Sequence, residues 1–121
     1  MLESILHVSI IVKNTQVALQ FYCDILKCEI NQDRPDLGFP GAWLNIGKLE
    51  IHILEVPNPD PIDNRPKHGG RDRHIAFSTI DLDQLTKQLS TYKIPFTESK
   101  SGRKAVFFRD PDGNTLEVIQ Q

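Results

Sequence analysis

The sequence predicts an α+β fold built from two copies of one βαβββ unit. Short runs of branched apolar residues alternate with longer segments of helical periodicity, and this order starts again after a Pro/Gly-rich segment near the middle of the chain. The two halves also match in sequence. His74 stands 67 residues after His7 and begins a similar strand, and residues 116–120 stand 65 residues after the IHILE segment at 51–55. An internal repeat explains both matches.

The first half begins with a strand at 5–12, which is rich in branched residues. Asn14 or Thr15 can cap the helix that follows, because both side chains accept hydrogen bonds from free helical N–H groups. This helix is expected to run to about Lys27, since its apolar residues form one stripe. A strand at 28–33, a loop at 35–41 and a hairpin of 42–46 and 49–56 that turns at Gly47-Lys48 complete the unit.

A linker at 57–72 separates the halves, and it holds four of the eight prolines and two of the seven glycines. After it, Asp81 or Asp83 is expected to cap a second helix that Pro95 ends. The predicted strands of this half lie at 73–79, 95–99, 104–109 and 114–120. A chain of 121 residues is expected to form one domain, with repeat one at 1–56 and repeat two at 73–121.

The composition is typical of a globular protein and excludes several classes of partner. Hydrophobic residues make up 39% of the chain and charged residues 25%, with a formal net charge of −2. Charges of both signs are spread along the chain, which predicts no binding to nucleic acid or membrane. We expect a cytoplasmic protein, because no membrane-spanning run or signal peptide is present. Cys23 and Cys28 are too few for a disulfide framework and are expected to be buried thiols.

Four side chains of metal-ligand type fall at repeat-related places on the predicted strands. Because side chains alternate across a strand, each of these strands has one apolar face and one mixed face. The mixed faces carry His7, His52, His74 and Glu117, whereas the remaining histidine, His68, lies in the linker. One such residue alone is usually solvated. Four at symmetric places favour a site for one divalent ion, with Ni, Zn, Co, Mn and Fe as candidates.

The glutamates of the predicted strands at 49–56 and 114–120 are expected to play different roles. Apolar residues flank Glu117, and an unpaired buried charge costs several kcal/mol, so Glu117 must face water, find a cation or stay protonated. A metal ion would stabilise its charged form. Glu50 shares the face of His52 and is expected to support that histidine without binding the ion itself. Glu55 points to the apolar side near a strand end and is expected to be solvated.

These segments resemble the vicinal oxygen chelate superfamily, which includes glyoxalase I, bleomycin-resistance proteins and extradiol dioxygenases. The resemblance covers the whole chain and rests on HVSIIVKN, ALQFYCDIL, IHILE, RHIAF and FFRDPDGNTLEVIQ. The last is the most specific, because the family typically ends in a DPDGN turn followed by a strand with a ligand glutamate. The resemblance implies a curled eight-stranded mixed sheet with a metal at its base, and it implies a homodimer. His7, His52, His74 and Glu117 fall on the family's four ligand positions.

Two positions depart from the family's pattern. Glyoxalase I often has glutamate or glutamine at the position of His52, so a three-histidine site changes the charge around the ion and its metal preference. Lys27 stands where the family commonly has glycine after the first helix, which concerns the geometry of that helix end.

The resemblance implies a glyoxalase I-like lyase or isomerase of the lactoylglutathione lyase type. Such an enzyme acts on a small oxygen-chelating substrate through a metal-stabilised enolate. Glu117 is the expected base, which removes a proton next to the chelated carbonyl and returns it to the neighbouring carbon. Arg71, Arg73 and Arg103 are the expected contacts for a carboxylate or thiol-conjugate substrate.

Two other functions stay open on the sequence. His7, His74 and Glu117 alone form the 2-His-1-carboxylate set of a non-haem Fe(II) extradiol dioxygenase, in which the position of His52 is normally not a ligand. Some relatives bind a drug without catalysis, and these usually lack the metal ligands. Because the fold hosts many reactions, the substrate of glyoxalase I itself is expected by analogy alone.

Overall fold

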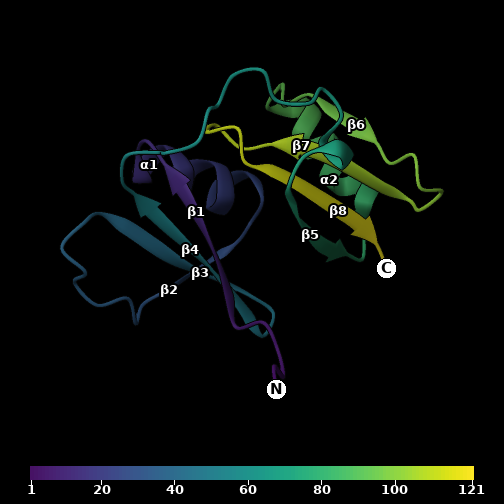
Figure 1. The fold of residues 1–121 in the computed structure, drawn as a ribbon. Helices are drawn as coiled ribbons and strands as arrows, with labels where there is room; N and C mark the ends of the chain where they lie inside the picture. Colours follow the sequence, from purple (N-terminus) through teal and green to yellow (C-terminus); the bar gives the residue numbers. More distant parts are fainter. The chain divides into compact units, whose positions relative to one another are not determined.

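The computed structural model describes residues 1–121, and the chain forms two compact units, Met1–Asp60 and Pro61–Gln121 (Figure 1). Each unit contains one four-stranded mixed sheet and has the element order βαβββ, apart from short added helical turns. The predicted α+β class with two βαβββ repeats is therefore confirmed, and the eight strands are divided equally between two sheets. None of the helices is long and apolar enough to span a bilayer.

The first unit buries one face of its sheet under its helix. The elements are β1 (His7–Val12), α1 (Thr15–Leu19), the π-helix η1 (Gln20–Ile25), β2 (Glu29–Asn31), β3 (Gly41–Ile46) and β4 (Leu49–Glu55). The strand order is β1-β4-β3-β2, with β1 parallel to β4 and the other pairs antiparallel. Val12, Ile51 and Ile53 are buried on the predicted apolar face, whereas His7 and Ser9 are exposed on the other.

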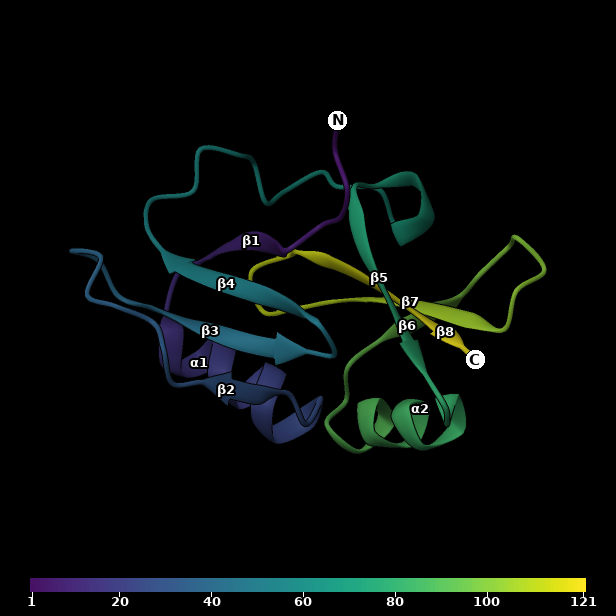
Figure 2. The same ribbon diagram turned by 90° about the horizontal axis from the view of Figure 1, so that it is seen from below.

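The second unit repeats this architecture. The elements are the 3₁₀ turn η2 (Gly69–Arg71), β5 (His74–Thr79), α2 (Leu82–Thr91), β6 (Phe96–Glu98), β7 (Ala105–Arg109) and β8 (Thr115–Gln120). The order β5-β8-β7-β6 is that of the first sheet. Figure 2 shows α1 with the first sheet and α2 with the second. Leu89 of α2 and Leu116 of β8 are fully buried and anchor this core.

Each helix begins at a predicted cap, and just beyond its C-cap residue stands a lysine with left-handed backbone angles. The Asn14 side chain accepts from the backbone N–H of Val17, and the Asp81 side chain accepts from that of Gln84. The first helix is not one α-helix to Lys27, because it becomes a π-helix after Leu19. The second helix ends at Thr91, before Pro95. The backbone N–H of Ile94 closes this helix on the carbonyl of Leu89.

The last strand of each unit also supplies a hydrogen-bond acceptor to the start of the helix. Glu55 Oε1 lies 2.7 Å from the backbone nitrogen of Thr15, and Gln120 Oε1 lies 2.8 Å from that of Leu82. The expectation of a solvated Glu55 is therefore wrong. The first N–H groups of a helix have no intrahelical partner, and an acidic group there is stabilised by the helix dipole.

The second part of the predicted linker is bound to the second unit. The boundary between the units falls after Asp60, within the linker. Asp72 accepts hydrogen bonds from Arg65 at 2.7 Å and from Arg109 of β7 at 2.8 Å. The other guanidinium nitrogen of Arg109 donates to the carbonyl of Pro66 at 2.6 Å. These bonds hold η2 and the start of β5 against the ends of β7 and β8.

Candidate functional site

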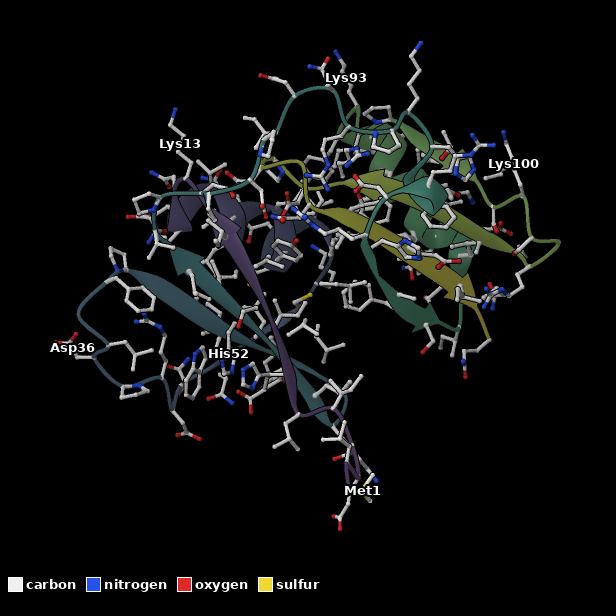
Figure 3. All side chains as sticks on the ribbon, viewed as in Figure 1. Met1, Lys13, Asp36, His52, Lys93 and Lys100 are labelled. Carbon is white, nitrogen blue, oxygen red and sulfur yellow. The ribbon has the colours of Figure 1, made fainter.

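The first unit brings two of the predicted ligands together as a pair of stacked rings. In the parallel register of β1 and β4, Ser9 lies opposite His52, so His7 and His52 are diagonal neighbours on one face. Their ring centroids are 3.9 Å apart with an interplanar angle of 11°. Trp43, opposite His52 on β3, stacks on the same imidazole at 4.2 Å. His52 (labelled in Figure 3) is thus held between two rings.

Glu50 is the polar partner of His52. Its Oε1 lies 3.0 Å from His52 Nε2, on the same face of β4. A carboxylate only accepts, so this contact places the ring proton on Nε2 and leaves the lone pair of a neutral imidazole on Nδ1. The contact is of the kind that orients a ligand histidine.

The second unit brings the other two predicted ligands together at the equivalent place. Glu117 lies opposite Ala76 in the register of β5 and β8, so His74 is its diagonal neighbour, as His7 is that of His52. His74 Nε2 lies 3.2 Å from Glu117 Oε2. Glu117 is only 4% exposed, and Phe107 presents its ring edge-on to His74 at 5.1 Å. A carboxylate is therefore buried with an imidazole as its only ion-pair partner.

The hydrogen bonds of His74 fix its tautomer. Its Nδ1 lies 2.8 Å from the backbone carbonyl oxygen of Asp72, which only accepts, so Nδ1 carries a proton. Nε2 therefore faces the carboxylate of Glu117 either with a second proton or with its lone pair. A cation between them, whether a proton or a metal ion, satisfies both groups. Nδ1–H bonded to a carbonyl is also the usual arrangement of a histidine that binds metal through Nε2.

Asp72 positions this histidine, although no sequence motif singles it out. Burial alone would raise the pKa of Asp72, but hydrogen bonds from Arg65 and Arg109 outweigh burial and hold the pKa well below its ordinary value. The charged carboxylate ties the backbone just before β5, whose carbonyl then accepts from His74. Its partners lie 7 and 37 residues away in the sequence, so no local pattern signals the contact.

The His74–Glu117 pair lines a cavity of about 350 Å³ within the second unit. Buried Phe107 and Glu117 form its inner wall, whereas Arg71, Lys100 and Arg103 lie at its exposed rim. Of the three arginines that the sequence predicts as substrate contacts, Arg71 and Arg103 line this cavity and Arg73 does not. Lys100 is an additional lining residue that is not predicted from the sequence, and Figure 3 shows it extending from the β6–β7 side of the unit.

Neither unit alone provides a complete metal site. Within each, no group of three or more His, Cys, Asp or Glu side chains is arranged to hold an ion. The two cysteines do not add ligands. Both are half-buried free thiols, and burial raises the pKa of Cys28 to about 11, so it stays protonated at neutral pH. The donor types nevertheless fit a divalent ion, because each unit pairs one histidine with a second nitrogen or oxygen ligand.

Comparisons with known proteins identify the family and the fold. Residues 4–118 match the Glyoxalase/Bleomycin resistance protein/Dioxygenase superfamily. The chain is 31% identical to the uncharacterised protein YaeR of Escherichia coli, covering 99% of this chain and 98% of that protein. It is 29% identical to Glyoxylase I 4 of Arabidopsis thaliana, covering 97% of this chain and 70% of that protein.

One solved structure shares the fold and contains a metal ion. It is a variant of the fosfomycin resistance protein FosX from Listeria monocytogenes, complexed with Mn(II) and 1S,2S-dihydroxypropylphosphonic acid. The TM-score is 0.77 at 22% sequence identity, and the match covers 99% of this chain and 93% of that one.

Proposed function

Because the chain belongs to the Glyoxalase/Bleomycin resistance protein/Dioxygenase superfamily, we propose that it is a divalent-metal-dependent enzyme of the glyoxalase I type. In this proposal it is a lyase or isomerase that acts on a small oxygen-chelating substrate. The observation that carries the proposal is the pairing of buried Glu117 with His74, whose Nδ1–H donates to the carbonyl oxygen of Asp72. The similarity to Glyoxylase I 4 supports the reaction type, and the Mn(II) in FosX supports the use of a metal.

His7, His52, His74 and Glu117 are the residues that would hold the ion. Three imidazoles and one carboxylate form a donor set that suits Ni, Zn, Co, Mn or Fe. Bound there, the ion would supply a Lewis acid that polarises a carbonyl of the substrate and stabilises the negative charge that develops beside it.

Glu117 is the proposed general base. Its carboxylate lies on a strand whose neighbours Leu116 and Val118 are buried, so few water molecules compete for the proton that it takes. It removes a proton from the carbon next to the carbonyl and returns the same proton to the neighbouring carbon. His74 Nε2 lies 3.2 Å from this carboxylate, a separation that suits two ligands of one ion.

Turnover of the hemithioacetal of methylglyoxal and glutathione tests this role. Glu117→Gln keeps the shape of the side chain but removes its basicity, so turnover should fall about a hundredfold or more. Glu98→Gln is the matched control, because Glu98 is exposed on β6 and its loss removes the same charge. Full activity in folded Glu117→Gln would exclude Glu117 as the base. No activity in the parent would exclude this substrate. The metal content of the purified parent would then decide whether the protein is a metal enzyme.

A second candidate function is an Fe(II) extradiol-type dioxygenase, and one observation favours it. Protein groups occupy both faces of the His52 ring and its Nε2: His7 and Trp43 stack on the ring, and Glu50 Oε1 lies 3.0 Å from Nε2. If His52 is not a ligand, the remaining residues form the 2-His-1-carboxylate set of that enzyme class. The two functions then differ in their metal and in the effect of removing His52.

A further inference from the structure

We propose that Cys23 and Cys28 are a redox-active pair that forms an intrachain disulfide when the protein meets a peroxide. The pair lies in the first unit, where the first helix ends and β2 is about to begin, and both cysteines are free thiols in the structure. The two thiols lose two hydrogen atoms in the reaction, and hydrogen peroxide is reduced to two water molecules. Thiol reductants break the bond again. The proposal does not depend on the proposed function.

The first argument is the hydrogen bond that closes the first helix. The backbone N–H of Cys28 donates to the carbonyl of Tyr22 at 2.9 Å, after the chain reverses direction at the left-handed Lys27. Since Cys23 directly follows Tyr22, this bond sets Cys28 beside Cys23. For such a bond within a helix, the donor residue and the residue after the acceptor have Cα atoms roughly 5 Å apart. Disulfides span Cα distances of about 4.4–6.8 Å, so this backbone geometry suits a disulfide.

The second argument is that the two thiols interact with each other. Burial, and then the neighbouring charge of Cys23, raise the pKa of Cys28 to about 11. The second of these causes acts strongly only between groups that lie close together. Both side chains are half-buried rather than fully enclosed, so a small oxidant can reach them. They are also the only two cysteines of the chain, and no third thiol competes for the bond.

The third argument comes from the other repeat, which closes its helix in a similar way without cysteines. The positions 66 residues after the two cysteines hold Leu89 and Ile94. The backbone N–H of Ile94 donates to the carbonyl of Leu89 at 2.8 Å, and Leu89 is fully buried. An apolar contact between such positions commonly accompanies this type of helix end. The closure therefore needs no sulfur, and packing alone does not explain why the first repeat has a thiol at both positions.

The reaction has two steps. Cys23 meets the oxidant first, because Cys28, with its pKa of about 11, stays protonated at neutral pH. The thiolate of Cys23 attacks one oxygen of hydrogen peroxide, the O–O bond breaks, and a sulfenic acid and a hydroxide ion form. The sulfur of Cys28 then attacks the sulfur of Cys23 and displaces the sulfenic oxygen as a second hydroxide ion. The two protons that the thiols release convert both hydroxide ions to water.

Peptide mapping of the oxidised full chain tests the proposal. Reduced protein is freed of reductant, treated with hydrogen peroxide, unfolded in the presence of iodoacetamide and digested with trypsin. Trypsin cuts after Lys27 and so places the two cysteines in different peptides, residues 14–27 and 28–48. We expect these peptides to stay joined, to carry no iodoacetamide label and to separate after treatment with dithiothreitol. A non-reducing gel should show no covalently joined pair of chains.

Single variants test the order of the two steps. Cys28→Ser leaves Cys23 without its partner, so the sulfenic acid should persist there and react with dimedone. Cys23→Ser leaves only the protonated thiol and should take up about tenfold less dimedone. Equal labelling of the two variants would overturn the assignment of Cys23 as the attacking thiol.

Cys23→Leu/Cys28→Ile is the matched control, because it installs the apolar pair of the second repeat. This variant should keep the fold and should not change in mass under the peroxide treatment that oxidises the parent. Three results in the parent would overturn the proposal. They are two labelled thiols under conditions that oxidise free cysteine, more highly oxidised cysteines without joined peptides, and joined chains on the non-reducing gel in place of an intrachain bond. Neither metal nor substrate enters these experiments, so their outcome is independent of whether the chain is a metal enzyme.

Discussion

Asp72 connects the charge network of the second unit to its candidate ligand. Its carboxylate accepts from Arg65 and Arg109, and its backbone carbonyl accepts from His74 Nδ1. A single residue therefore fixes both the position of the strand start and the tautomer of the histidine. The side chain of Asp72 is 8% exposed, so its ion pairs are shielded from solvent and contribute more than exposed pairs do.

The lowered pKa of Asp72 predicts a pH-dependent contribution to stability. In the folded protein the pKa of Asp72 lies below its ordinary value of 3.8. The stabilisation by the charged carboxylate is therefore complete above pH 3.8 and is lost as the pH falls towards the folded-state pKa. Asp72→Asn should lower the free energy of unfolding by about 3 kcal/mol at pH 7, because two arginines lose their carboxylate. The difference between parent and variant should shrink below about pH 4.

Urea denaturation at pH 7 and pH 3 measures both effects. Asp63→Asn is the control, because Asp63 is exposed, and it should change stability little at either pH. An equal difference between parent and Asp72→Asn at both pH values would contradict the assigned role of the carboxylate.

At the scale of elements, the C-cap residue of each helix is followed by a lysine with left-handed backbone angles. Lys27 has φ 63° and Lys93 has φ 57°, and the two positions are 66 residues apart in the repeat. The departure from the family's glycine at Lys27 therefore leaves the geometry of the helix end intact but introduces strain. A β-carbon in this region costs roughly 1 kcal/mol relative to glycine.

Glycine at either helix end should stabilise the protein. We expect Lys27→Gly and Lys93→Gly each to raise the free energy of unfolding by about 0.5–1 kcal/mol, measured by thermal or urea denaturation. Lys87→Gly, in the exposed interior of α2, is the control and should lower it by about 1 kcal/mol. Destabilisation by all three substitutions would show that the lysines at the helix ends are not strained.

At the scale of the whole molecule, the sequence predicts the features that depend on the periodicity of apolar residues and on the internal repeat. The repeat, the strand faces and the caps at Asn14 and Asp81 follow from local patterns, and the structure contains them. Contacts between distant segments were not predictable in this way. The bond from Thr15 to Glu55 joins residues 40 apart, and the change to a π-helix after Leu19 has no signal in the apolar stripe.

The same distinction between local sequence patterns and contacts of distant segments applies to the candidate site. Alternation along the strands placed His7 and His52 on one face, and likewise His74 and Glu117, because neighbours on parallel strands share a face. The ring stack around His52 and the bond from His74 to the carbonyl of Asp72 depend on side-chain angles and on the path of the linker. Neither is encoded in the spacing of the residues.

The central claim is that His7, His52, His74 and Glu117 hold one divalent ion, and metal content tests it most directly. Untagged parent protein, Glu98→Gln, His52→Ala and His7→Ala/Glu117→Gln are analysed by plasma mass spectrometry. We predict about one equivalent of metal in the parent and the Glu98→Gln control, with loss of the metal from the double variant. Nickel, cobalt or zinc that is lost in His52→Ala supports the glyoxalase type, whereas iron retained in that variant supports the dioxygenase. No metal in the parent, with none taken up on soaking in these ions, would contradict the claim and leave a small-molecule-binding protein.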